Sequence, residues 1–197
     1  MELKYLHLIE DCEKPMLLKN LSKIIYSMFK LDIPVYECSY FEECSYTRSG
    51  FPQEIYMKFR RKSIEHQKKH EICFINNLDD YNEERFFDRM PKFLFIFFHE
   101  LSHILTSDNL GEEKRKMYEW ESKYSGIVDT NTLYRRFPYE RLADNLSVAL
   151  FENNKEMIYK ILSGKRFRTS KEKRENNARI VREYKEKYIK PELFVLQ

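Results

Sequence analysis

Near the middle of the chain, two histidines and a glutamate have the types and the spacing that metal chemistry needs. His99, Glu100 and His103 form an H-E-x-x-H pattern. On an α-helix, residues four apart lie one turn above each other on nearly the same face, so both imidazoles can point at one ion. Imidazole nitrogens suit Zn²⁺. Glu100 lies about 100° round the helix from His99, where it could act as general base on a metal-bound water.

The residues before this pattern predict the helix that must position it. Phe93–Phe98 is a continuous apolar run, and a helix that is apolar all round is a buried one. Pro91 suits the first turn, and the residues of Ser107–Gly111 carry the signals that end a helix. Buried histidines and glutamates must be paired or must bind a metal. The alternative is a buried helix whose two histidines only make hydrogen bonds.

A catalytic zinc site needs a third protein ligand, and no histidine follows His103. Glu140 and Asp144 are four residues apart, so their carboxylates share one face of a predicted helix. Glu140 could complete a His₂Glu site that keeps one position open for water. Asp144 could accept the other ring N–H of one histidine, with His99 as the preferred partner. The alternative is a solvated acidic stripe on a surface helix.

Two other groups of residues compete for a metal. Glu119 and Glu121 lie between the two motifs but lack an aspartate four residues on, so they rank below Glu140 as the third ligand. Their segment, Glu112–Tyr124, predicts a short amphipathic helix that is either a lid over the cleft or an ordinary surface excursion. His66 and His70 are also four apart, but no acid lies between them and lysines flank them, which favours a solvated face.

The two motifs together resemble a known group. H-E-x-x-H followed by E-x-x-A-D is similar to the gluzincin metallopeptidases, and most similar to the IrrE/ImmA-like family of cytosolic zinc-peptidase domains. The resemblance covers roughly residues 15–155. It implies that His99, His103 and Glu140 bind zinc and that Glu100 is the catalytic base. It also implies a protein or peptide substrate, such as a regulator or repressor, and a cytoplasmic location.

The remaining patterns and the resemblance predict an α+β fold. We expect a zincin-like chain that is mainly helical, with a small β-sheet beside the HExxH helix. Helices are predicted from Pro15 to about Leu31 and over Phe137–Asn153, the latter pattern continuing to Gly164. Strands are predicted over Glu54–Arg60 and Glu71–Asn76. The resemblance implies that one of these strands receives the substrate as an added strand.

The C-terminal part of the chain differs in charge from the rest. The net charge is +3, yet 165–190 alone holds 11 lysines and arginines against 4 glutamates. We expect residues 1–164 to form the metallopeptidase domain and 165–197 to pack on it as a basic helix from about Lys171 with an extended apolar tail at Leu193–Leu196. Such a stretch could contact nucleic acid or an acidic partner, but a solvated helix is the preferred interpretation.

Composition and cysteine usage limit the class of protein. At 197 residues with 42% apolar and 34% charged residues, the chain suits one globular domain. The start lacks the signal-peptide pattern, and no apolar run is long enough to cross a bilayer, so we expect a cytoplasmic protein. No C-x-x-C pair occurs, which favours free thiols, with a Cys38–Cys44 disulfide as the alternative. The cysteines are Cys12, Cys38, Cys44 and Cys73.

Two functional hypotheses follow from these observations. The favoured one is a zinc metalloendopeptidase of the HExxH gluzincin type that uses Glu100 as general base. The alternative is a metal-binding regulatory or protein-interaction module whose peptidase-like site is structural or vestigial. The resemblance supports both, because peptidase-like domains of the IrrE/ImmA-like group also serve regulatory roles.

Overall fold

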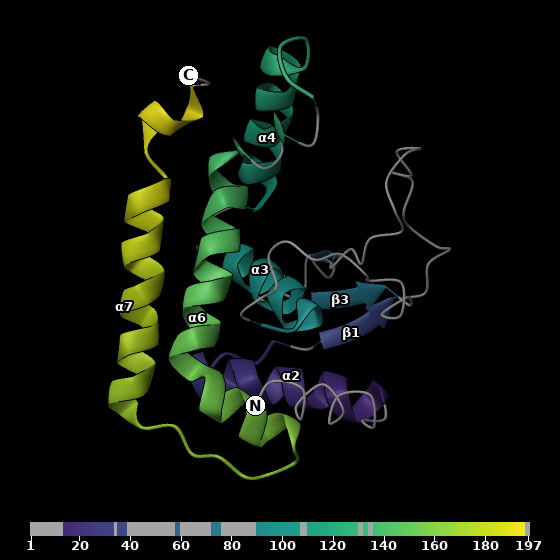
Figure 1. The fold of residues 1–197 in the computed structure, drawn as a ribbon, viewed down its shortest axis with the longest axis vertical. Helices are drawn as coiled ribbons and strands as arrows, with labels where there is room; N and C mark the ends of the chain where they lie inside the picture. Colours follow the sequence, from purple (N-terminus) through teal and green to yellow (C-terminus); the bar gives the residue numbers. More distant parts are fainter. Residues whose placement is uncertain are drawn as a thin grey trace.

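The computed structural model describes residues 14–33, 35–38, 58–59, 72–75, 90–106, 110–129, 132–133 and 136–195. His66, His70, Cys12 and Cys44 lie outside these ranges, so the predictions made for them stay predictions. The long helices cross and stack on one another (Figure 1). The helical elements are α2 (Lys14–Phe29), α3 (Lys92–Thr106), α4 (Leu110–Tyr124), α6 (Pro138–Leu162), α7 (Lys171–Tyr188) and the 3₁₀-helix η3 (Pro191–Phe194).

The α+β class expected from the sequence is wrong. The described part of the chain is 79% helical, and within it no β-sheet forms a layer of the fold. The recorded strands are at most four residues long and pair in the order β1-β3-β2. Most of the described core residues come from helices, and Val35 of β1 is also among them. The strands are β1 (Val35–Cys38), β2 (Lys58–Phe59) and β3 (Ile72–Ile75), with β3 parallel to β1 and antiparallel to β2.

Helix α3 forms where the apolar run predicts it. Pro91 directly precedes its first residue, and the Pro91 carbonyl accepts hydrogen bonds from the backbone N–H groups of Leu94 and Phe95. The helix ends at Thr106, whose hydroxyl donates to the Ser102 carbonyl at 2.8 Å. The helix is apolar on most sides and buried, with six core residues: Leu94, Phe95, Phe97, Phe98, Leu101 and Ile104.

Helix α6 is a single unbroken helix of 25 residues that joins two predicted helical stretches. Pro138 occupies its first turn, where the missing N–H is not needed. The helix ends before Gly164, whose φ of 73° lies in the left-handed region that glycine adopts easily. One face of α6 packs on α3, and others contact α7 and α2. Helices α6 and α7 run side by side in opposite directions (Figure 1).

Helix α7 begins at Lys171, as expected, and is attached to the core by a polar contact as well as an apolar stripe. The Asn177 side chain is fully buried and donates to the Met28 carbonyl at 3.3 Å. Its amide oxygen accepts from Asn153 at 2.8 Å and from Asn154 at 2.9 Å. These contacts join α2, α6 and α7 through one side chain. Many basic residues of α7 are exposed, and Arg179 pairs with Glu183 on the same helix.

A second apolar cluster joins α4 to the start of α6 and to the C-terminal segment. It consists of Trp120, Tyr124, Leu133, Phe137 and Tyr139, with Phe194 packed against it. The Trp120 ring N–H donates to the Leu133 carbonyl at 3.0 Å. The prediction of an extended tail over Leu193–Leu196 is wrong for Leu193 and Phe194, because both residues belong to the 3₁₀-helix η3. The Phe194 ring contacts the rings of Phe137 and Tyr139.

The described helices can also be compared with the span of a membrane. Within the ranges that the structure describes, no helix is both long enough and apolar enough to cross a bilayer. Cys38 and Cys73 lie in β1 and β3, whereas the partner proposed for Cys38 lies outside the described residues.

Candidate metal centre

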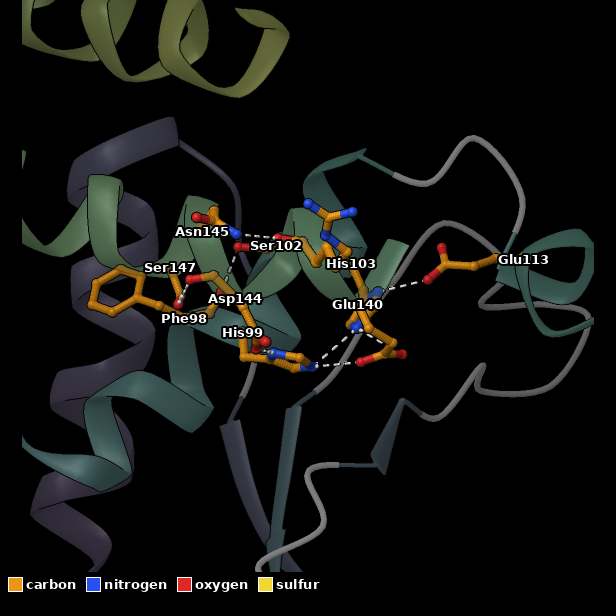
Figure 2. A network of polar contacts seen from close by, with 10 residues as sticks. Phe98, His99, Ser102, His103, Glu113, Glu140, Asp144, Asn145 and Ser147 are labelled. Carbon is orange, nitrogen blue, oxygen red and sulfur yellow. Dashed lines mark hydrogen bonds and ion pairs between the residues drawn. The ribbon is translucent and has the colours of Figure 1, made fainter. Parts of the chain in front are cut away.

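Three side chains from two helices converge at one point. His99 and His103 come from α3 and Glu140 from α6, and one ligand atom of each lies within 4.8 Å of the others (Figure 2). The Nε2 atoms of the two histidines are 3.2 Å apart. His99 Nε2 lies 3.1 Å from Glu140 Oε2, and His103 Nε2 lies 3.6 Å from Glu140 Oε1. All three side chains are buried.

The local sequence explains this convergence. The four-residue spacing puts His99 and His103 on one face of α3. Glu140 lies in the first turn of α6, directly after Pro138 has started the helix. Because α3 packs along α6, the first turn of α6 meets the histidine face of α3. The contact between two helices that are far apart in the chain therefore brings the third candidate ligand to the first two.

Each histidine also contacts a carboxylate at its other ring nitrogen. Asp144, one turn after Glu140 on α6, has Oδ1 at 2.8 Å from His99 Nδ1. This is the arrangement that the spacing of Glu140 and Asp144 led us to expect. On His103, Nδ1 lies 2.6 Å from Oε1 of Glu113, which belongs to α4 (Figure 2). Both imidazoles are thus oriented with Nε2 towards the point of convergence.

No pattern in the sequence singled out Glu113. It lies in the first turn of α4. Acidic residues are common there because the positive end of the helix dipole stabilises their negative charge. The residues that sequence reasoning considered in this segment lie elsewhere. Glu119 is exposed and pairs with Arg115. Among the described residues, neither Glu119 nor Glu121 belongs to a group that could hold a metal.

The donor set fits a divalent cation. Among the described residues, no donor makes a hydrogen bond to the buried Glu140 Oε2, although His99 Nε2 lies 3.1 Å away. A buried acceptor without a donor typically costs about 1–3 kcal/mol, unless a cation satisfies it. Two imidazole nitrogens and one carboxylate are the protein ligands of many catalytic zinc sites, which leave the fourth position open.

The charges around the centre shift the pKa values of its groups when no ion is bound. Burial lowers the pKa of His99, but contacts with Asp144 and Glu140 outweigh burial and raise it to about 10. Burial also lowers the pKa of His103, but Glu140 and Glu113 raise it well above its usual value. Burial raises the pKa of Glu140, yet the two imidazoles lower it far below the ordinary carboxyl range.

Glu100 lies beside the convergence point on α3 and is half-buried. Burial raises its pKa to about 7, although the nearby His99 and His103 lower it. A carboxylate whose pKa is near the working pH is well suited to taking up a proton and then releasing it. The structure therefore places next to the candidate ligands a group able to act as a general base.

Comparisons with known proteins identify no relative. No protein-family model matches the chain, and it matches no curated protein and no solved structure. The similarity to gluzincins and to the IrrE/ImmA-like family therefore depends only on the motifs around His99 and Glu140.

Proposed function

We propose that this protein is a zinc-dependent metallopeptidase that hydrolyses a peptide bond in a protein substrate. The convergence of His99, His103 and Glu140, with ligand atoms within 4.8 Å of one another, is the observation that carries the proposal. The carboxylates at the outer ring nitrogens support it, because histidines that bind a metal almost always donate their other N–H to such a group.

The choice of zinc follows from the chemistry of the donors. Imidazole nitrogen is a common zinc ligand, whereas Mg²⁺ and Ca²⁺ prefer sites made of oxygen ligands. Three protein ligands leave one position free, which is the difference between a catalytic zinc site and a closed structural one. Zinc bound at this point would polarise a substrate carbonyl and lower the pKa of a water towards about 7.

Glu100 supplies the proton transfers of the proposed reaction. Its carboxylate takes a proton from the water as the water oxygen forms a bond to the peptide carbonyl carbon. The same carboxyl group then gives the proton to the peptide nitrogen as the carbon–nitrogen bond breaks. The products are a carboxylic acid and an amine, and the acid then loses its proton to water. Without an ion, burial raises the pKa of Glu100 to about 7.

The substrate and the location in this proposal come from the family resemblance. A protein substrate, such as a regulator or repressor, and a cytoplasmic location are what the IrrE/ImmA-like family implies for the motifs at His99 and Glu140. A zinc metallopeptidase would also give a role to the Glu100 carboxyl, which interacts electrostatically with the candidate ligands and which a structural metal site does not need.

Metal analysis combined with Glu100→Gln tests the proposal. The native protein and the variant are loaded with zinc and incubated with a peptide library prepared from a digested proteome, and new termini are identified by mass spectrometry. We expect the native protein to cut peptides. Cleavage should stop when zinc is chelated and resume when zinc is added back. Glu100→Gln should retain zinc while its cleavage rate falls about 10²–10⁴-fold, the usual contribution of general acid–base catalysis.

Two outcomes would contradict this function. Cleavage that is unchanged in Glu100→Gln would remove Glu100 from the mechanism, and a native protein that binds no zinc would remove the metal centre. Zinc bound equally by both proteins without any cleavage would favour the regulatory module instead. Glu152→Gln, an exposed glutamate on α6, is a matched control that should cut peptides at the native rate.

A further inference from the structure

Glu113 contacts the candidate metal centre from an element that carries none of the three candidate ligands. Its Oε1 atom lies 2.6 Å from Nδ1 of His103, and both side chains are buried. The two nitrogens of an imidazole ring point in different directions, and Nε2 of His103 faces His99 and Glu140. Glu113 therefore meets His103 on the side away from the convergence point and acts on the centre only through that ring.

The buried carboxylate of Glu113 is only partly satisfied. Among the described residues, the second carboxylate oxygen of Glu113, Oε2, is buried without a hydrogen-bond partner. A buried charge that is only partly satisfied destabilises a fold, and an apolar residue of similar volume is often at least as stable in such a place. A polar group kept in a buried site despite this penalty calls for another explanation, and a functional role is one.

The position of Glu113 is set by packing that does not involve its carboxylate. Helix α4 is held by the apolar cluster of Trp120, Tyr124 and Phe137 and by the hydrogen bond from Trp120 to the Leu133 carbonyl. Glu113 is thus presented to His103 by an anchored helix, which is how precise sites keep their supporting groups in place. Substituting Glu113 leaves this anchor intact.

We propose that Glu113 is a positioning residue of the metal centre, which holds His103 in the orientation and tautomer that direct Nε2 to the metal. Asp144 has the corresponding contact with His99. The inference rests on the proposed zinc site and assigns α4 a part in it. A carboxylate that accepts the Nδ1 proton fixes that proton on Nδ1, leaves the lone pair on Nε2, and makes Nε2 a stronger donor to the ion.

The test compares zinc affinities of variants at Glu113 with that of a matched control. Glu113→Ala removes both the charge and the acceptor, whereas Glu113→Gln keeps an acceptor oxygen for the Nδ1 proton. Glu119→Gln removes one charge from the exposed face of the same helix. Zinc affinity is measured by competition with a chromophoric chelator, and the folded fraction of each metal-free protein is measured by circular dichroism.

We expect Glu113→Ala to bind zinc about 10–100-fold more weakly, the usual effect of losing such a partner. Glu113→Gln should lose less, because it keeps the hydrogen bond, and Glu119→Gln should match the native protein. The visible absorption spectrum of Co²⁺ bound in place of zinc gives a second readout. It should change in the folded Glu113 variants, because reorienting His103 alters the ligand field, and a purely structural role would leave it unchanged.

The inference is overturned if both folded Glu113 variants bind zinc with native affinity and give the native Co²⁺ spectrum. Should Glu113→Ala fail to fold, Glu113→Gln decides by the same two measurements. A native protein that binds no zinc overturns the proposed function together with this inference. A native protein that binds zinc and cuts peptides, while the Glu113 variants bind zinc normally, overturns the inference alone.

Discussion

The Nε2 atoms of His99 and His103 lie 3.2 Å apart, and each ring meets a carboxylate at its opposite nitrogen. These two carboxylates orient the rings so that their Nε2 atoms face each other. Helix α3 supplies the imidazoles, α6 supplies Glu140 and Asp144, and α4 supplies Glu113. Because each helix is fixed by apolar packing, the arrangement of these side chains is a property of the folded core.

Asp144 should act on zinc affinity through His99. We expect Asp144→Ala to weaken zinc binding about 10–100-fold, because the His99 ring loses the group that fixes its tautomer and orientation. The measurement is competition with a chelator of known affinity. Asn145→Ala is the control, since this neighbouring side chain is exposed and donates to the Arg141 carbonyl of its own helix. Equal affinities in the two variants would contradict a supporting role for Asp144.

Zinc should stabilise the folded protein through Glu140. A ligand present at one hundred times its dissociation constant adds about 2.7 kcal/mol to the free energy of unfolding when it does not bind the unfolded chain. We therefore expect zinc to raise the melting temperature and a chelator to reverse the rise. Glu140→Ala should lose most of this shift, while the exposed control Glu152→Ala keeps it. An equal shift in both variants would show that zinc binds elsewhere.

Without metal, the stability of the protein should fall as the pH rises. The pKa of His99 is raised from 6.5 to about 10, so its protonated form stabilises the fold fully below about pH 6.5, and this contribution is lost as the pH rises towards 10. Burial raises the pKa of Glu100 from 4.5 to about 7. The free energy of unfolding therefore also falls as the pH rises from 4.5 to about 7.

Urea unfolding of the metal-free protein between pH 6.5 and 10 measures this dependence. The free energy of unfolding should decrease across the range, and His99→Gln should show a smaller decrease because its side chain does not titrate. A native protein whose stability is constant or increases over this range would show that protonated His99 is not paired in the fold.

The buried amide of Asn177 should matter for stability. Asn177→Ala leaves the Met28 carbonyl and the Asn153 and Asn154 amides without this partner, and each buried group left unsatisfied costs about 1–3 kcal/mol. We expect a clear loss in the free energy of unfolding, measured by urea titration. Arg182→Ala, at an exposed position of the same helix, should change stability by less than about 0.5 kcal/mol. Comparable losses in the two variants would contradict this role.

Local patterns in the sequence predicted the helices well but failed on the fold class. The apolar run before His99 predicted α3, and Pro138 with the apolar spacing after it predicted the start of α6, because helix periodicity is a property of neighbouring residues. Of the predicted strands Glu54–Arg60 and Glu71–Asn76, the structure describes Lys58–Phe59 and Ile72–Ile75, and these residues do pair as strands. Alternation of apolar and polar residues predicts which side chains of a strand would face the core. Pairing with distant residues determines whether the strand forms and how long it is.

The sequence by itself determined which side chains share a helix face, namely His99 with His103 and Glu140 with Asp144. Only the tertiary structure decided that these two faces meet, and that Glu113 of α4 reaches the outer nitrogen of His103. The physical reason is that spacing along a helix is fixed by backbone hydrogen bonds between neighbouring turns, whereas the approach of separate helices depends on how their apolar side chains pack together.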